Sequence, residues 1–418
     1  MNIMEIDRID SGHSDRARAA GAAMLQALEK ALPTVAKHAD EVEELGMAHP
    51  EAIAAIEQSG FFRSLVPLQY GGLEYDPASF MAACIRLGAV CPATAWVACL
   101  VHVHSWQIAL MDKRMQDEFW ASGPDTRASS TYPPTGTVKS VEGGYLLSGS
   151  WHYSSGVDHA QWTLLGGQIV DAPDGVVEFR SFCVPASDLV VKGESWDVIG
   201  LKGTGSKTLV LDNVFVPEYR THSASNVYGR TEIGFSENDR PLYRLPWLSI
   251  FYSTIAGVAV GTARGGVDRF VEATKSRVSF AGKGMQMAAN PFVQLRIANA
   301  LAEVNKADDR LVRMWDEMFD TTLRGEEPDQ STRLRSRFEG ADCNASAYNA
   351  LSQIMEMAGG GVLFAANPLQ RYFRDLLGMR VHPTAQRELF GSWYVQHLLG
   401  VDLPPFDKGS MFSLLMHA

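Results

Sequence analysis

The chain has 418 residues, of which 46% are hydrophobic and 20% charged, and its formal net charge is −11. This length and this balance predict a folded protein of two or three domains with a large core, and they exclude a disordered chain. The negative charge, without any long run of Lys and Arg, argues against nucleic acid as a partner.

The first residues, MNIMEIDRID, are acidic where a secretory signal would be basic and then apolar, and no run of eighteen apolar residues follows. We therefore expect no membrane span and a cytoplasmic location. The five cysteines are scattered, without a Cys-x-x-Cys pair or a histidine at metal spacing beside them. They are expected to be buried and to bind no metal.

Residues 1–125 are predicted to form an N-terminal all-α domain. Apolar residues recur three or four positions apart, as in Leu25, Leu28 and Leu32, which is typical of amphipathic helices. The stretch 78–110 is apolar on all sides and predicts a helix pair deep in the core.

Residues 126–225 are predicted to form a β barrel or sandwich, because the pattern changes near Pro124. Short β-branched and aromatic runs, bounded by turn residues, occur at 162–165, 176–184 and 208–216. A polar connector at 223–240 is expected to lead out of this domain.

Residues 226–418 are predicted to form a C-terminal helical bundle. Gly257, Gly261 and Gly265 recur every four residues, so one helix face has no side chains and another backbone can approach it closely. The predicted fold class is therefore α+β, with a helical domain, a central β barrel or sandwich and a C-terminal four-helix bundle.

Several motifs occur in the order typical of the acyl-CoA dehydrogenase superfamily. They are Tyr70-Gly71-Gly72, the run from Gly200 to Ser206 that leads into 211–217, and Gly359-Gly360-Gly361 followed by Arg374-Asp375. The chain resembles this superfamily over nearly its whole length. The resemblance implies a homotetramer and a flavin held by the residues that match the family's pattern, which are Arg277, Phe280, Gln294, Gly360 and Arg374.

The carboxylate base that the dehydrogenases of this superfamily need is missing from its usual place. Counted from Arg374, that place falls on Pro383, which has no basic group. The adjacent His382 instead resembles the two-component flavin-dependent monooxygenases built on this fold. That branch includes the oxygenase components of 4-hydroxyphenylacetate hydroxylase and of the steroid-ring phenol hydroxylase, and the dibenzothiophene monooxygenase.

A serine motif supports the monooxygenase branch. The segment from Trp151 through Ser154, Ser155 and Gly156 is similar to the hydroxylases, in which a serine hydroxyl hydrogen-bonds the flavin near N5. The resemblance assigns this contact to Ser155, with Ser154 as the alternative, and places Trp151 at the cofactor.

The segment Val103-His104-Ser105-Trp106 also resembles the hydroxylases. There the histidine reaches the phenolic oxygen of the substrate, and Ser130 matches a serine that faces the same oxygen. Trp106 is assigned to the substrate site. Further aromatic and methionine side chains are unranked candidates for the pocket wall, namely Tyr132, Trp151, Phe251, Met355 and Met357.

Together the resemblances imply the oxygenase component of a flavin-dependent monooxygenase, with His382, Ser155 and His104 as catalytic residues. Reduced FMN or FAD would react with O2 to give a C4a-hydroperoxyflavin that hydroxylates a small aromatic, phenol-like or indole-like, substrate. The chain has no strand–helix G-x-G-x-x-G motif for a nicotinamide, so a separate NAD(P)H-dependent reductase is expected to supply the reduced flavin.

Three other functions remain open at this point. An acyl-CoA dehydrogenase or oxidase would need a displaced base, for which Asp158, Glu194, Asp268 and Glu388 are the candidates. An amine N-oxygenase would use the same scaffold on a different acceptor. A non-catalytic binding protein would bind no flavin.

Overall fold

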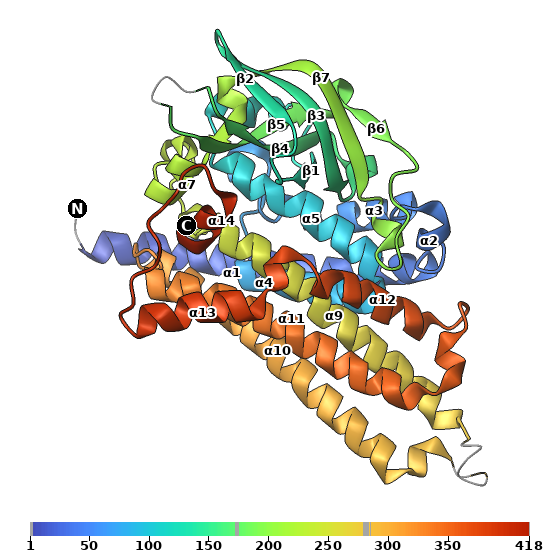
Figure 1. Ribbon diagram of the computed structural model, residues 1–418. Helices are drawn as coiled ribbons and strands as arrows, with labels where there is room; N and C mark the ends of the chain where they lie inside the picture. Colours follow the sequence, from blue (N-terminus) through green and yellow to red (C-terminus); the bar gives the residue numbers. More distant parts are fainter. Residues whose placement is uncertain (1–2, 172–174, 279–283, 285, 418) are drawn as a thin grey trace.

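The computed structural model describes residues 3–171, 175–278, 284 and 286–417. Its first part is helical and passes beneath the sheets, with α5 next to the strands (Figure 1). The helices of this part are α1 (Ile3–Lys37), α2 (Val42–Leu45), α3 (Pro50–Gln58), α4 (Pro77–Val90), α5 (Pro92–Ala109) and α6 (Lys113–Phe119).

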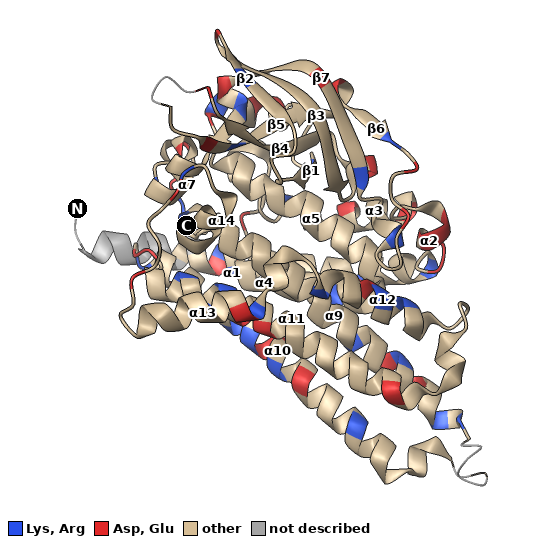
Figure 2. Ribbon diagram, in the orientation of Figure 1, with Lys and Arg blue, Asp and Glu red and all other residues tan. Residues whose placement is uncertain are grey.

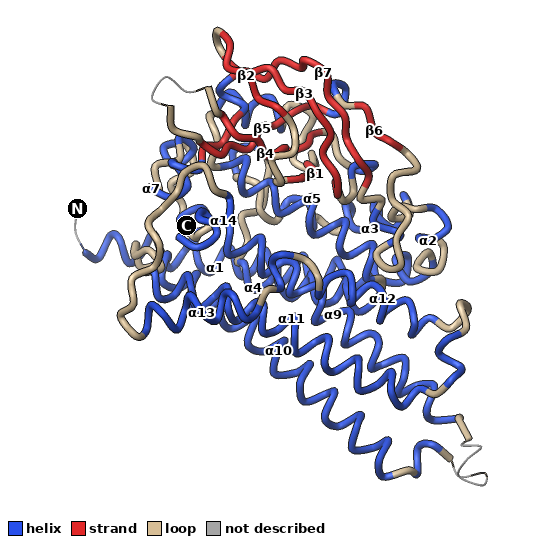
Figure 3. The backbone as a smooth tube through the Cα atoms, in the orientation of Figure 1, coloured by secondary structure: helices blue, strands red, loops and turns tan. Residues whose placement is uncertain are grey.

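Two four-stranded sheets follow, with strand orders β1-β4-β5-β8 and β2-β3-β7-β6. They enclose an apolar core of their own, in which Leu147, Trp151 and Phe182 are fully buried. The strands gather on one side of the molecule (Figure 3). They are β1 (Ala128–Thr131), β2 (Thr137–Val141), β3 (Gly144–Ser154), β4 (Trp162–Ile169), β5 (Glu178–Pro185), β6 (Val190–Lys192), β7 (Lys207–Pro217) and β8 (Thr221–Ser223).

The rest of the chain is again helical, and the long helices α9, α10 and α11 pack with α12 as a bundle. The expected polar connector at 223–240 contains the short helix α7 and a 3₁₀ turn at Ile233–Ser236. The helices are α7 (Ala224–Gly229), α8 (Pro241–Arg244), α9 (Trp247–Ser276), α10 (Pro291–Leu323), α11 (Gln330–Ala358), α12 (Pro368–Arg380), α13 (Arg387–Leu398) and α14 (Met411–His417).

Helix α5 lies between the strands and the other helices, and every one of its residues is buried. It begins with Pro92, which suits the first turn of a helix because that turn has no acceptor for its N–H groups. It contains no charged residue, so it can be buried on all sides without unpaired charge. Figure 2 shows it without charged positions, while α10 and α11 carry many.

The glycine repeat of α9 lies against α4, and the sequence predicted that another backbone can approach this face closely. A Cβ on Gly261 would come within 2.0 Å of the carbonyl oxygen of Ile85, and one on Gly265 within 2.0 Å of the oxygen of Ala89. The two helix backbones therefore touch, which only glycine allows at these positions. This contact joins the first helical part of the chain to the last in one apolar core.

All five cysteines are buried and free, as expected. Among the described residues, no helix combines the length and the apolar character that a membrane span requires.

Candidate functional site

A cavity of about 890 Å³ lies where α5, the sheets, α9 and the α12–α13 segment meet. This is a size that ordinary ligand pockets reach. His104, Ser130, Ser155 and His382, which lie far apart in the sequence, all line it. Most of the wall is apolar or aromatic, contributed by Trp96, Leu100, Tyr132, Trp196, Leu201, Leu248, Phe251, Tyr252, Leu377, Val381, Met411, Phe412 and Leu415.

Ser155 is the first member of a row of hydroxyl groups. Its Oγ lies 2.7 Å from Oγ of Ser206, which lies 2.7 Å from Oγ1 of Thr204. Thr204 donates its proton to the carbonyl oxygen of Leu201 at 2.8 Å. Because each hydroxyl has one proton, Ser206 must donate to Thr204 and Ser155 to Ser206.

The direction of these hydrogen bonds decides whether Ser155 can act as a donor or as an acceptor toward the cavity. Its proton is already used, and its oxygen accepts the indole N–H of Trp96 at 3.0 Å. One acceptor position is left on Oγ. Ser155 is therefore suited to receive an N–H or O–H from a group bound in the cavity.

Trp96 is a site residue that the sequence analysis missed. Besides its bond to Ser155, its ring lies edge to face against His382, with the ring centroids 5.6 Å apart. Trp96 lies two turns before His104 on α5, so the two residues share a helix face. The position of Trp96 relative to His104 was the sequence signal that could have placed it at the site.

His382 is held by the turn that follows it. Its Nδ1 accepts the backbone N–H of Thr384 at 3.3 Å and lies 2.9 Å from Oγ1 of the same residue. Burial lowers the pKa of His382 to about 4. The neutral ring thus carries its proton on Nε2, which can donate a hydrogen bond.

His104 lines the same cavity and is almost completely buried. Its Nδ1 lies 3.2 Å from the hydroxyl of Tyr132, and its ring lies 5.6 Å from that of Phe251. Burial lowers the pKa of His104 to about 3, so the ring is neutral near pH 7. Ser130, at the end of β1, lines the cavity beside Tyr132.

The loop at 199–206 is fixed against α12. A Cβ on Gly200 would come within 2.0 Å of the carbonyl oxygen of Arg374, and the N–H of Leu201 donates to Oδ1 of Asp375 at 2.6 Å. The guanidinium of Arg374 bonds Glu43 and the carbonyl of Ile199. Arg374 thus supports this wall and is not among the residues that line the cavity.

Three other residues assigned to flavin binding, Arg277, Gln294 and Gly360, do not line the cavity. Arg277 ends α9, and a Cβ on Gly359 would meet its guanidinium at 2.8 Å, so Arg277 and the segment with Gly360 are neighbours. Gln294 is exposed at the start of α10 and donates to the carbonyl of Ala288. Phe280 lies outside the described residues.

Several expected pocket residues are placed in the core instead. Trp106 is fully buried and packs edge to face against Tyr243. Trp151 lies between the two sheets and donates to the carbonyl of Gly166 at 2.8 Å. Ser154 is buried and bonds Ser129. These three residues do not line the cavity, and neither do Met355 and Met357.

The C-terminal helix α14 is a part of the wall that the sequence analysis did not anticipate. Its residues Met411, Phe412 and Leu415 line the cavity, and α14 packs beside α7 (Figure 1). The segment before it is tied to β5, because the N–H of Phe179 donates to the carbonyl of Lys408 at 2.8 Å.

No Asp or Glu occurs among the described residues that line the cavity. Of the four carboxylates considered as a displaced base, Asp158 forms an ion pair with Lys207 at 2.6 Å, and Glu194, Asp268 and Glu388 also lie outside the lining. A dehydrogenase could not remove a proton from its substrate here without such a group.

One cluster of possible metal ligands lies elsewhere, although the sequence suggested none. Ring nitrogens of His38 and His49 and a carboxylate oxygen of Glu41 lie within 4.8 Å of one another. The two rings are stacked, with centroids 3.7 Å apart, and both are paired with Glu41. The contacts of Glu41 with both rings account for the arrangement.

Comparisons with known proteins agree with this geometry. Residues 20–120 match the acyl-CoA dehydrogenase N-terminal domain, and residues 253–387 match the C-terminal domain. The flavin-dependent monooxygenase oxygenase subunit HsaA of Mycobacterium tuberculosis is 37% identical over 385 residues, which cover 92% of this chain and 96% of that protein.

Two further similarities extend over nearly the whole chain. The oxygenase component of p-hydroxyphenylacetate 3-hydroxylase from Acinetobacter baumannii is 31% identical, over 96% of this chain and 95% of that protein. The crystal structure of 3-HSA hydroxylase from Rhodococcus sp. RHA1 has a TM-score of 0.86 and 34% identity, over 92% of this chain and 98% of that one. The chain therefore belongs to the flavin-dependent monooxygenase oxygenase components within the acyl-CoA dehydrogenase fold.

Proposed function

We propose that this oxygenase hydroxylates a small phenol-like or indole-like substrate, with reduced FMN or FAD and O2. The observation that carries the proposal is one cavity lined by His382, Ser155, His104 and Ser130, with no carboxylate among the described residues of its lining. Two of the similar proteins are named as hydroxylases of aromatic compounds or of 3-HSA.

Ser155 is proposed to hold the flavin. A reduced flavin has an N–H at N5, whereas an oxidised flavin has none, and the one acceptor position left on Ser155 suits the reduced form. The bound reduced flavin, with O2, supplies the oxygen atom for transfer. Ser155 and Trp96 would keep the N5 proton in place, and the apolar wall would exclude the water that favours wasteful loss of hydrogen peroxide.

His382 is proposed to donate a hydrogen bond during oxygen transfer. Its Nδ1 is occupied by the N–H of Thr384, so Nε2 of the neutral ring carries the proton and can donate a hydrogen bond to an oxygen that gains negative charge. The ring of Trp96 packs edge to face against the imidazole, with the centroids 5.6 Å apart. One donor of this kind contributes about 10²–10³-fold to rates.

His104 and Ser130 are proposed to bind the hydroxyl or N–H of the substrate. Since His104 is neutral, it can accept a hydrogen bond and raise the electron density on the ring carbon that is attacked. The aromatic side chains of Phe251 and Tyr252 suit a planar substrate.

The remaining partners follow from the same function. A separate NAD(P)H-dependent reductase would deliver the reduced flavin, and we expect the enzyme in the cytoplasm, where reduced nicotinamides are made. A homotetramer would explain why Arg277, Gln294 and Gly360 lie away from the cavity, because they could then meet the flavin of another subunit.

The test is to mix the protein anaerobically with reduced FMN or FAD and then add O2 together with phenol, indole or an amine. Hydroxylated aromatic product that depends on reduced flavin supports the proposal. An N–O product alone would point to an amine oxygenase, and reduction of bound oxidised flavin by an acyl-CoA would overturn it.

Variants test the assigned roles. Ser155→Ala and His382→Ala are expected to bind reduced flavin but to release most of the consumed oxygen as hydrogen peroxide. Tight coupling of oxygen consumption to product in both variants would contradict the roles of the two residues.

A further inference from the structure

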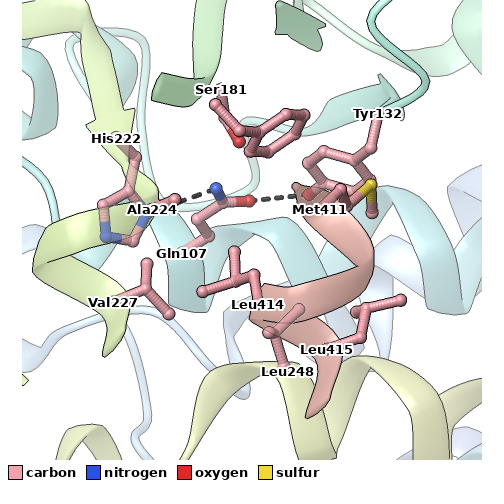
Figure 4. Close-up of a pocket in the computed structure, with 11 residues that line it drawn as sticks. Gln107, Tyr132, Ser181, His222, Ala224, Val227, Leu248, Met411, Leu414 and Leu415 are labelled. Carbon is pink, nitrogen blue, oxygen red and sulfur yellow. Dashed lines mark hydrogen bonds between the residues drawn. The ribbon is translucent and has the colours of Figure 1, made fainter. Parts of the chain in front are cut away.

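A row of hydrogen bonds leads from the cavity wall into the interior, and Figure 4 shows its part from Tyr132 through Gln107 to His222. It joins His104 and Gln107 on α5, Tyr132 after β1 and His222 on β8, and each of these side chains is at least nine-tenths buried. Figure 4 shows the amide of Gln107 between Tyr132 on one side and His222 on the other. The proposed function uses only the first member of this row.

The distances fix the direction of the row. The hydroxyl of Tyr132 lies 2.7 Å from Oε1 of Gln107, which is typical of an O–H···O bond and shorter than the usual N–H···O distance of about 2.9–3.0 Å. Tyr132 therefore donates to Gln107. The amide nitrogen of Gln107 then faces Nδ1 of His222 at 3.3 Å and donates to it.

This direction determines the tautomer of His104. Tyr132 has a single proton, which Gln107 takes, so Nδ1 of His104 at 3.2 Å must be the donor to the tyrosine oxygen. A neutral ring with its proton on Nδ1 has a bare Nε2. Ser130 lies two residues before Tyr132 and lines the same cavity.

We propose that Tyr132 and Gln107 are positioning residues that hold His104 in the tautomer with a bare Nε2, which makes it an acceptor for the substrate's hydroxyl or N–H. The inference rests on the proposed function for the identity of the ligand, but the tautomer itself does not depend on any ligand. Neither residue needs to touch the reacting atoms.

The proposal predicts that two conservative variants differ in a specific way. Gln107→Met removes the acceptor of the tyrosine proton, which then turns to Nδ1 of His104 and forces the ring proton onto Nε2. Tyr132→Phe only removes the partner of Nδ1, so both tautomers become populated. The change farther from the cavity should thus have the larger effect on His104.

The first experiment reads the tautomer directly. Protein labelled with [¹⁵N]histidine is studied by long-range ¹H–¹⁵N correlation spectra, and His104 is assigned by its loss in His104→Gln. We expect the Nδ1–H form in the unmodified protein, the Nε2–H form in Gln107→Met and a mixture in Tyr132→Phe. An Nε2–H form in the unmodified protein, or no change in Gln107→Met, would overturn the proposal.

Tyr243→Phe is the matched control. It also removes a buried tyrosine hydroxyl, which donates to the carbonyl of Leu65 at 3.2 Å, but Tyr243 does not line the cavity. Its His104 signal is expected to equal that of the unmodified protein. An altered His104 signal in this control would show that the loss of any buried hydroxyl disturbs the ring. It would count against a specific role of Tyr132 and Gln107.

The second experiment uses 4-nitrophenol, whose absorbance distinguishes phenol from phenolate. The unmodified protein is expected to bind it with a raised apparent pKa of the nitrophenol, because the bare Nε2 accepts from the phenol form and repels the phenolate. Gln107→Met is expected to bind the phenol form about tenfold more weakly. If Gln107→Met changes the tautomer of His104 and yet binds nitrophenol with the same affinity and the same phenolate fraction as the unmodified protein, the link between the tautomer and ligand binding is overturned. Absence of binding in every protein would count against a phenolic substrate, while the histidine spectra still decide the tautomer.

Discussion

The indole N–H of Trp96 donates to Oγ of Ser155 at 3.0 Å, although the two residues lie 59 positions apart. The bond joins helix α5 to the turn after β3, and it occupies one of the two acceptor positions of the serine. Trp96 therefore controls how Ser155 faces the cavity.

Trp96→Phe should separate the effect of this hydrogen bond from the effect of the packing of the ring. The phenyl ring can still lie against His382, but the hydrogen bond is lost, at a cost of about 0.5–1.5 kcal/mol in the free energy of unfolding. With a less firmly held Ser155, the share of consumed oxygen released as hydrogen peroxide should rise. Urea unfolding and a peroxide assay measure the two effects.

Trp315→Phe provides the control for Trp96→Phe. Trp315 is fully buried in α10, and its indole nitrogen has no hydrogen-bond partner among the described residues. This variant should leave the peroxide share unchanged. A similar rise in both variants would mean that Trp96 acts only through packing.

The sequence predicted the layers of this fold because they depend on local patterns. The spacing of Gly257, Gly261 and Gly265 predicted a helix face that another backbone can approach, and α4 lies there. The apolar stretch at 78–110 required buried helices. Such patterns lie within one segment of the sequence, so they can be recognised without knowing which other segments pack against it.

The site was predicted less completely, because its walls come from distant segments. His104, Ser130, Ser155 and His382 meet in one cavity, whereas Trp106 faces the core. On a fully buried helix the hydrophobic pattern does not show which side faces the cavity, so only the position relative to His104 could have indicated it. Likewise, nothing in the composition of 411–417 indicated that α14 returns to cover the site.

The pH dependence of stability should reflect histidines that are buried in the neutral form. Burial lowers the pKa of His102 to about 3, well below its usual value near 6.5. Between these values the unfolded chain binds a proton that the folded chain does not, so the folded state loses stability as the pH falls through this window. His104 and His222 behave in the same way.

His102→Gln tests this effect, because the amide oxygen can replace Nε2 as the acceptor for Ser64 and Leu65. Between pH 6 and pH 4.5 the variant should lose about 1.4 kcal/mol less of its free energy of unfolding per pH unit than the unmodified protein. Urea unfolding at several pH values measures the slope. An equal slope in the variant and the unmodified protein would contradict this account.

Asp375 should contribute to the stability of the folded chain through its acceptor oxygen more than through a negative charge. Burial raises the pKa of Asp375 to about 7, while its Oδ1 accepts the N–H of Leu201. The folded chain therefore holds a proton that the unfolded chain releases, and stability falls as the pH rises from about 4 to 7. Asp375→Asn, which keeps an acceptor, should gain in stability relative to the unmodified protein as the pH rises.

Asp375→Leu should instead leave the N–H of Leu201 buried without an acceptor, at a cost of about 1–3 kcal/mol. Leu201 has a φ of 57°, a conformation that only surrounding contacts maintain in a leucine. Freed of Asp375, the cavity wall at 199–206 should loosen, and hydrogen peroxide release should rise. Equal peroxide release in the Asn and Leu variants would contradict this role.

Gly261→Ala tests the contact between α4 and α9. The added methyl group would lie 2.0 Å from the carbonyl oxygen of Ile85, a backbone atom that cannot move without the whole helix. We expect a loss of about 1–3 kcal/mol or more in the free energy of unfolding, as in other overpacked cores. Thermal and urea unfolding measure it.

The comparison is Gly340→Ala, in the middle of α11. The nearest atom to its added methyl group is Oγ of Ser253 at 3.8 Å, so nothing opposes the change. Alanine also has the higher helix propensity, by about 1 kcal/mol. The same substitution should therefore destabilise the protein at position 261 and leave it equal or more stable at position 340. Equal losses at both positions would mean that the close approach of α4 to α9 is not what requires glycine.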